Sequence, residues 1–123
     1  MKRIFTALVF AALFSGCTPM DDYNVVIKNV GGKTIDDAHV LYGEFRSVGG
    51  ILPPDIWSKH MLPDHPIPEK AMVEWRTEDG VMHREEVEVL KHIPKGFRGD
   101  IQFEIDDDNS VTVRVIPEKP GSD

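Results

Sequence analysis

The chain has one cysteine, Cys17, in 123 residues. A lone cysteine cannot form a disulfide within the chain, so a folded domain here must draw its stability from its core. Basic residues are also scarce, since 14 Lys and Arg stand against 21 Asp and Glu and the net charge is −7. A nucleic-acid-binding protein needs a basic surface, so this balance argues against a nucleic-acid partner. It favours a water-facing surface or a basic protein partner.

The chain also lacks an apolar run long enough to cross a bilayer, which needs about 20 residues. Its apolar segment at 4–14 follows two basic residues and precedes two small ones, an order typical of a secretory signal peptide. The ending Phe-Ser-Gly-Cys at 14–17 resembles a bacterial lipobox. This resemblance implies signal cleavage between Gly16 and Cys17 and lipidation of Cys17, including palmitate. An ordinary secretory signal and an apolar first helix of a cytosolic protein are the alternatives.

Several acyl chains on one cysteine would anchor the protein stably, because each buried methylene contributes roughly 0.8 kcal/mol. Thr18 stands where an aspartate marks inner-membrane retention in lipoproteins of enteric-type bacteria. The resemblance therefore implies the outer membrane as the location, with the protein facing the periplasm.

Four parts make up the expected domain organisation. Residues 1–16 are predicted to be the lipoprotein signal peptide and 17–24 a polar, lipidated tether. Residues 25–117 form one folded domain, because about 100 residues suit a single core. Residues 118–123 are predicted to be a flexible tail.

Two hairpins stand out in the predicted domain. Apolar and polar residues alternate at 71–76 and again at 81–90, around a turn that ends in Asp-Gly. This pattern places Trp75 in the core. The same alternation at 101–106 and 111–116 surrounds an Asp-Asp-Asn-Ser turn and predicts the second hairpin.

A β-branched run at 25–28 and a weaker pattern at 39–44 add two strands, and no stretch has a sustained helical period. The fold class is therefore predicted to be all-β: a small antiparallel β-sandwich, immunoglobulin-like, with about six to seven strands. The Cys–Trp–Cys core of antibody domains is absent from the sequence.

The segment 46–69 contains five prolines, which exclude a central strand and predict a long loop. Loops of this length in a compact domain are usually functional or mobile. Its apolar residues either cap the sandwich or contact a partner. Asp55, Ile56 and Trp57 are the candidate partner-binding residues, because tryptophan is enriched at binding hot spots. The alternative is that Trp57 plugs one end of the sandwich.

Metal and calcium sites have little support in the sequence, and no metal or cofactor is predicted. His60 and His65 flank Asp64, but prolines interrupt the segment and His39, His83 and His92 are scattered. The acidic run 106–109 lacks the glycine and glutamate of an EF-hand, so it is predicted to be a hairpin turn.

Nucleophilic catalysis has no support either. The serines after the signal peptide lie outside any Gly-x-Ser-x-Gly motif, and Ser58 is too close to His60 along the chain to indicate a catalytic pair. The chain is therefore predicted not to be an enzyme.

Three segments resemble the small lipoproteins encoded beside phospholipase effectors of type VI secretion systems: Ile67-Pro68-Glu69-Lys70-Ala71, Trp75-Arg76-Thr77-Glu78-Asp79-Gly80 and Glu86-Val87-Glu88-Val89. The resemblance implies an immunity protein that binds and neutralises a phospholipase toxin in the periplasm. It carries over no binding residue. Two other functions stay open: a structural or accessory envelope lipoprotein for assembly or adhesion with no toxin partner, and a small ligand-binding sandwich.

Overall fold

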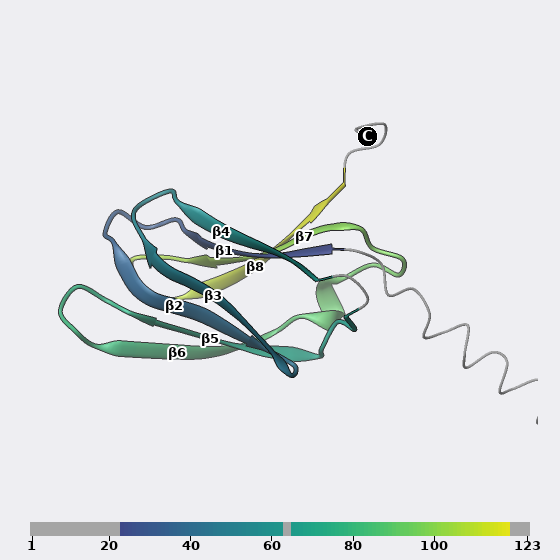
Figure 1. The fold of residues 1–123 in the computed structure, drawn as a ribbon, viewed down its shortest axis with the longest axis horizontal. Helices are drawn as coiled ribbons and strands as arrows, with labels where there is room; N and C mark the ends of the chain where they lie inside the picture. The colour runs from purple at the N-terminus through teal and green to yellow at the C-terminus, as the bar shows by residue number, and fades with distance from the viewer. Residues whose placement is uncertain (1–22, 63–64, 119–123) are drawn as a thin grey trace, which may run out of the picture.

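A computed structural model describes residues 23–62 and 65–118, which form two four-stranded sheets packed face to face (Figure 1). The first sheet has the strand order β4-β1-β7-β8, with β1 Tyr23–Asn29, β4 Trp57–Leu62, β7 Gly99–Ile105 and β8 Val111–Pro117. The second has the order β3-β2-β5-β6, with β2 Ile35–Tyr42, β3 Phe45–Leu52, β5 Lys70–Arg76 and β6 Met82–Glu88.

The predicted all-β sandwich is confirmed, with eight strands in place of six to seven. Neighbouring strands are antiparallel, with the exception of β1 and β7, which run parallel. One short 3-10 helix, η1 (Leu90–His92), stands between β6 and β7. Within residues 23–62 and 65–118, no helix has the length and apolar character needed to cross a membrane. The signal peptide, Gly16 and Cys17 lie outside the described residues.

The prediction of one long loop over 46–69 is wrong, because this segment contains most of β3 and all of β4. Both strands lie at sheet edges, where a proline without an N–H can face solvent and need not remove a ladder hydrogen bond. Pro53 and Pro54 stand in the four-residue connection between them, so they do not interrupt either ladder. Gly49 and Gly50 in β3 weaken the alternation that would have revealed the strand.

Two strand boundaries also differ from the prediction. β1 begins at Tyr23, so the last two residues assigned to the tether belong to the sheet, and Tyr23 is buried. β2 begins at Ile35 and not at His39. The register of β2 shifts between Ile35 and His39, and Asp37 has a φ of 53°, so regular alternation is interrupted over the first residues of this strand.

The core lies between the two sheets and contains the inward residues of both predicted hairpins. Trp75 is 1 % exposed, as the sequence predicts for a core residue. Tyr42 packs edge-on against Phe103 from the opposite sheet, with ring centroids 6.3 Å apart. Burial raises the pKa values of Tyr23 and Tyr42, so both phenols stay neutral and pack as apolar rings.

Strand directions bring four connections to one end of the sandwich, which we call the turn end: 30–34, 53–56, 77–81 and 106–110. The first and last described residues lie toward the opposite end, since Tyr23 pairs with Gly99 and Gly99 with Pro117 (Figure 1). The sandwich therefore has one end near its termini and another built entirely of turns.

Candidate functional site

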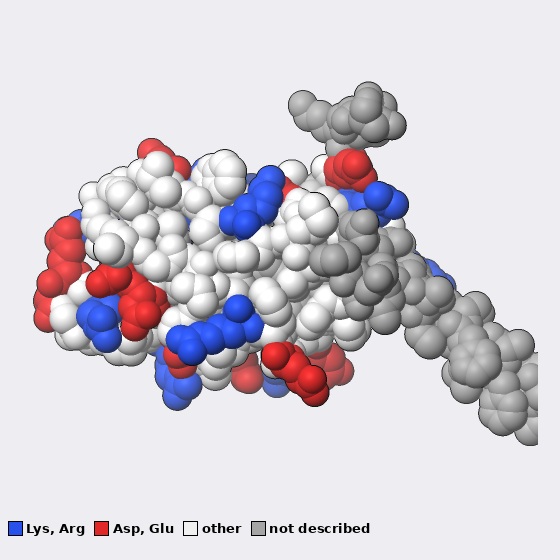
Figure 2. Space-filling view, viewed as in Figure 1, with Lys and Arg blue, Asp and Glu red and all other residues white. Residues whose placement is uncertain are grey.

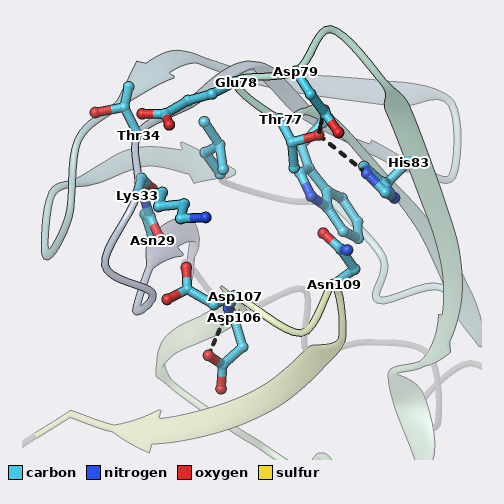
Figure 3. Close-up of a pocket in the computed structure, with 12 residues that line it drawn as sticks. Asn29, Lys33, Thr34, Thr77, Glu78, Asp79, His83, Asp106, Asp107 and Asn109 are labelled. Carbon is cyan, nitrogen blue, oxygen red and sulfur yellow. Dashed lines mark hydrogen bonds between the residues drawn. The ribbon is translucent and has the colours of Figure 1, made fainter.

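A pocket of about 320 Å³ opens at the turn end, and we call it the tip pocket (Figure 3). Three of the four connections line it, namely 30–34, 77–81 and 106–110, and the strand residues Asn29, Ile35, Trp75 and His83 complete its wall. This volume is at the lower limit of ordinary ligand-binding clefts. The tip pocket therefore suits a small group or a single side chain of a larger partner.

Asn29, at the end of β1, holds the wall of the tip pocket together. Its side-chain amide donates to the backbone carbonyl oxygens of Lys33 at 2.7 Å and Leu52 at 2.8 Å. Its side-chain oxygen accepts the N–H of Gly31 at 2.9 Å. Asn29 is buried, so these bonds satisfy its polar atoms away from water and fix the path of the 30–34 connection.

A second clamp joins the 30–34 and 106–110 connections. The N–H of Gly32 donates to both carboxylate oxygens of Asp107, at 2.9 and 3.0 Å. Gly31 allows this approach, because an added Cβ would lie 2.2 Å from Asp107 Oδ1. The predicted 106–109 turn is confirmed: Asp106 and Asn109 close it with backbone bonds, and Asn109 has a φ of 62°.

The opposite wall is built on Trp75. The ring of His83 stacks on the indole of Trp75, with centroids 5.5 Å apart and an interplanar angle of 17°. The hydroxyl of Thr77 lies 3.2 Å from His83 Nε2 and donates to Asp79 Oδ1 at 2.5 Å. This bond and the N–H of Val81 lower the pKa of Asp79, so its carboxylate stays charged at neutral pH.

The tip pocket has a strongly acidic lining. Glu78, Asp79, Asp106 and Asp107 contribute four carboxylates, whereas Lys33 is the one Lys or Arg among its lining residues. Figure 2 shows acidic side chains gathered at the same end of the molecule. The turn end therefore carries a negative potential that attracts cations and basic surfaces.

The candidate partner-binding residues lie at the turn end too: Asp55 and Ile56 belong to the connection between β3 and β4, and Trp57 is the first residue of β4. The N–H of Asp55 donates to the carbonyl oxygen of Asn29, and the carbonyl oxygen of Ile56 accepts the N–H of Asn29. Trp57 begins β4 and is 52 % exposed, with the ammonium of Lys59 5.3 Å from its ring centroid. Trp57 therefore does not plug the sandwich, and with half-exposed Ile56 it forms an apolar surface.

The histidines considered as metal ligands make structural contacts. His65 packs against the rings of Tyr42 and Phe45, with centroid separations of 5.7 and 5.9 Å. His60 points between the sheets toward Ser47. Asp64 lies outside the described residues. Within residues 23–62 and 65–118, no three His, Cys, Asp or Glu side chains are grouped so that they could hold a metal ion.

One Ser–His contact joins residues that no sequence motif connects. Ser47 Oγ on β3 lies 3.0 Å from His60 Nδ1 on β4, so this pair joins the edges of the two sheets. Ser47 is 0 % exposed, which leaves a substrate no access to its hydroxyl. The contact serves as a polar link between the layers, because His60 gives the buried Ser47 hydroxyl a hydrogen-bond partner.

No protein-family model and no curated protein matches the chain. A solved structure, the NMR structure of a protein from Eubacterium rectale, is similar, with a TM-score of 0.53. The match covers 80 % of this chain and 92 % of the other chain at 15 % sequence identity. This likeness shows a shared β-sandwich fold and carries no statement about function.

Proposed function

We propose that this chain is a lipid-anchored protein on the periplasmic side of the bacterial outer membrane that binds and neutralises a secreted phospholipase toxin without catalysis. The observation that carries the proposal is the apolar surface formed by Ile56 and Trp57 at the turn end. A half-exposed tryptophan beside a stiff proline turn is the kind of anchor that protein interfaces use.

The proposed lipid anchor orients this surface. The step from Cys17 to Tyr23 spans at most about 22 Å, because an extended chain rises no more than about 3.6 Å per residue. Tyr23 begins β1, whereas Asn29 ends it at the turn end. Lipidation of Cys17 therefore keeps the terminal end close to the membrane and lets the turn end face the periplasm.

Charge supports the same orientation. The acidic tip pocket at the turn end is repelled by anionic lipid and attracted to a basic protein surface. A phospholipase works at the membrane, so a membrane-held inhibitor meets it at a raised effective concentration. The apolar surface of Ile56 and Trp57 would then supply affinity, while the acidic residues would speed the encounter.

Protection of cells tests the proposal. If this chain is an immunity protein, a lipase gene lies beside its own gene. In the experiment, that lipase is directed to the periplasm of cells with and without the full chain. The full chain should restore growth and suppress lipase activity in extracts. Unchanged toxicity together with the absence of a complex would contradict the proposal and favour an accessory envelope lipoprotein.

Anchoring is tested separately. Metabolic labelling with palmitate should mark the wild-type chain and leave Cys17→Ser unmarked. The variant should leave the membrane fraction and protect cells less well at equal abundance. A variant that still fractionates with the outer membrane would contradict the lipid anchor without affecting the proposed binding to the toxin.

A further inference from the structure

We infer that the free edge of β8 is a docking surface for an extended segment of a protein partner, which adds a strand to the sheet and directs one lysine or arginine toward Glu85. The inference concerns a second surface of the molecule and goes beyond the proposed function. Three features carry it: an unpaired backbone edge, a row of partly buried valines along that edge, and an unpaired carboxylate on the facing strand.

The backbone of β8 has hydrogen-bonding groups that its sheet leaves unpaired. Within the described residues, β8 pairs with β7 alone. The N–H of Asp106 donates to Ser110 and the N–H of Glu118 to Arg98, which places hydrogen-bonded pairs at both ends of the β7–β8 ladder. Such pairs alternate along an antiparallel ladder, so every second residue of β8 points its N–H and C=O groups away from β7. Three valines do so: Val111, Val113 and Val115.

The same three edge valines leave apolar surface on the open side of the sandwich. They pair across the ladder with the buried residues Ile105, Phe103 and Ile101, so their side chains point between the sheets. They are nonetheless only partly buried, as is Val87 on β6, the strand that lies nearest β8 in the other sheet. A strand added beside β8 would cover this surface and pair with the free backbone groups at the same time.

The other three sheet edges of the described structure are covered or interrupted. Ser47 on β3 contacts His60 on β4, so these two edges close against each other. Gly50 in β3 has a φ of 71°, which interrupts the regular geometry that a new strand needs. The edge strand β6 directs Glu85 inward, and an inward charge opposes pairing with another strand. The edge of β8 is therefore the one that an added strand fits best.

Glu85 sets the chemistry of the added strand. It lies opposite buried Val73 in the β5–β6 ladder, so its partly buried carboxylate points between the sheets, on the side of the sandwich where β8 lies. None of the seven ion pairs within residues 23–62 and 65–118 involves Glu85. A partly desolvated carboxylate favours a cationic partner. The added strand should therefore have apolar residues on its inner face and a lysine or arginine near Glu85.

Peptide titration tests the added strand directly. The full chain with Cys17→Ser is labelled with ¹⁵N and titrated with N-acetyl-Thr-Val-Thr-Lys-Thr-Val-Thr-amide at constant ionic strength. The amide proton resonances of the three edge valines should move downfield, as new hydrogen bonds form. Those of Thr112 and Arg114 should move less, because these groups already bond to β7. Edge resonances that stay in place, or equal shifts in both sets, would overturn the inference.

Backbone-methylated peptides separate strand pairing from side-chain contact. N-methyl groups on the two valines and the lysine of the peptide remove the donors that face β8, so binding should weaken by about ten-fold or more. N-methyl groups on the two threonines that flank the lysine remove donors that face solvent, and should change the affinity by no more than about three-fold. Equal weakening by the two methylated peptides would overturn the strand pairing, and neither peptide alters the fold of the protein.

A charge exchange tests the role of Glu85. Glu85→Lys should weaken binding of the lysine peptide by about ten-fold or more, because an attraction becomes a repulsion. The same variant should strengthen binding of an otherwise identical peptide with glutamate in place of lysine. Glu88→Lys makes the same charge change on the outer face of β6 and should alter both affinities by no more than about two-fold. Equal effects of the two variants would overturn the assigned role of Glu85.

Sedimentation of the free chain tests the alternative occupant, a second copy of the protein. A monomer leaves the β8 edge open for a partner, as inferred. A dimer in which the N–H groups of the edge valines are already hydrogen-bonded would overturn the assigned partner. None of these measurements uses the toxin, so a chain that protects cells but ignores the peptide keeps the proposed function and loses this inference.

Discussion

His39 Nε2 lies 2.6 Å from Glu74 Oε1, and this contact joins β2 to β5 on the outer face of their sheet. Nδ1 of the same ring faces the carbonyl oxygen of Asp37 at 3.0 Å, so both ring nitrogens meet acceptors. Arg84 on β6 donates to the other oxygen of Glu74 at 2.6 Å. These contacts, that with His39 above all, lower the pKa of Glu74 below its ordinary value of 4.5.

The first prediction concerns acid stability. Because the pKa of Glu74 is lower in the folded state than in the unfolded state, the carboxylate stabilises the fold fully above the unfolded value of 4.5. That stabilisation is lost as the pH falls through the folded pKa. Glu74→Gln should therefore lose less of its free energy of unfolding between about pH 6 and pH 3 than the wild type does.

Urea denaturation at a series of pH values measures this difference. Asp79 and Glu104 also have lowered pKa values, so Glu74→Gln should reduce the loss of stability at acid pH without abolishing it. Glu88→Gln removes an exposed carboxylate from the neighbouring strand and should lose as much stability at acid pH as the wild type does. Parallel pH profiles for wild type and Glu74→Gln would contradict the assigned role of Glu74.

The second prediction concerns Asn29. Asn29→Ala leaves the carbonyl oxygens of Lys33 and Leu52 without their donor, in a buried place. We expect a loss of about 3 kcal/mol in the free energy of unfolding, because unsatisfied buried groups are costly. Asn24→Ala removes a bond to Asp100 on the outer face of the same strand and should cost less than about 1 kcal/mol. Equal losses would show that Asn29 does not organise the turn end.

The third prediction concerns Gly31. Gly31→Ala places a Cβ 2.2 Å from Asp107 Oδ1, so the clamp between the two connections must open. We expect a loss of about 1–3 kcal/mol in stability, the range for overpacking a close contact. Gly80→Ala serves as the comparison for backbone strain without a steric clash, because Gly80 has a φ of 86° but no atom lies within 4 Å of its Cβ position. Thermal unfolding measures both, and chemical-shift changes at Gly32 and Asp107 should appear in Gly31→Ala alone.

The hairpins could be predicted from sequence because their patterns are local. β5 and β6, and likewise β7 and β8, alternate cleanly around short turns with residues that tolerate positive φ. β3 and β4 were missed because glycines interrupt one and prolines flank both. The parallel pairing of β1 with β7 joins strands far apart in the chain, which no local pattern encodes.

The candidate site could likewise be predicted from the sequence only in part. Asp55, Ile56 and Trp57 were chosen from the sequence because tryptophan is enriched at binding hot spots, and their role as a partner surface stays a prediction. The tip pocket could not be predicted, because three connections from different parts of the chain build it. The contact of Gly32 with Asp107 depends on the β1–β7 register, which joins segments far apart in the chain.

The last prediction concerns Trp57. Trp57→Ala should weaken binding to the phospholipase by at least about ten-fold, because truncation of a hot-spot tryptophan commonly costs 2 kcal/mol or more. The fold should tolerate the change, since Trp57 is 52 % exposed and its neighbour Lys59 pairs with Asp100 without it. Val48→Ala is the matched control, because Val48 is also 52 % exposed but lies on β3 of the other sheet. Calorimetric titration of both variants against the toxin, with melting curves alongside, separates a lost contact from a lost fold. Wild-type affinity in a folded Trp57→Ala chain would move the toxin contact away from the β3–β4 connection.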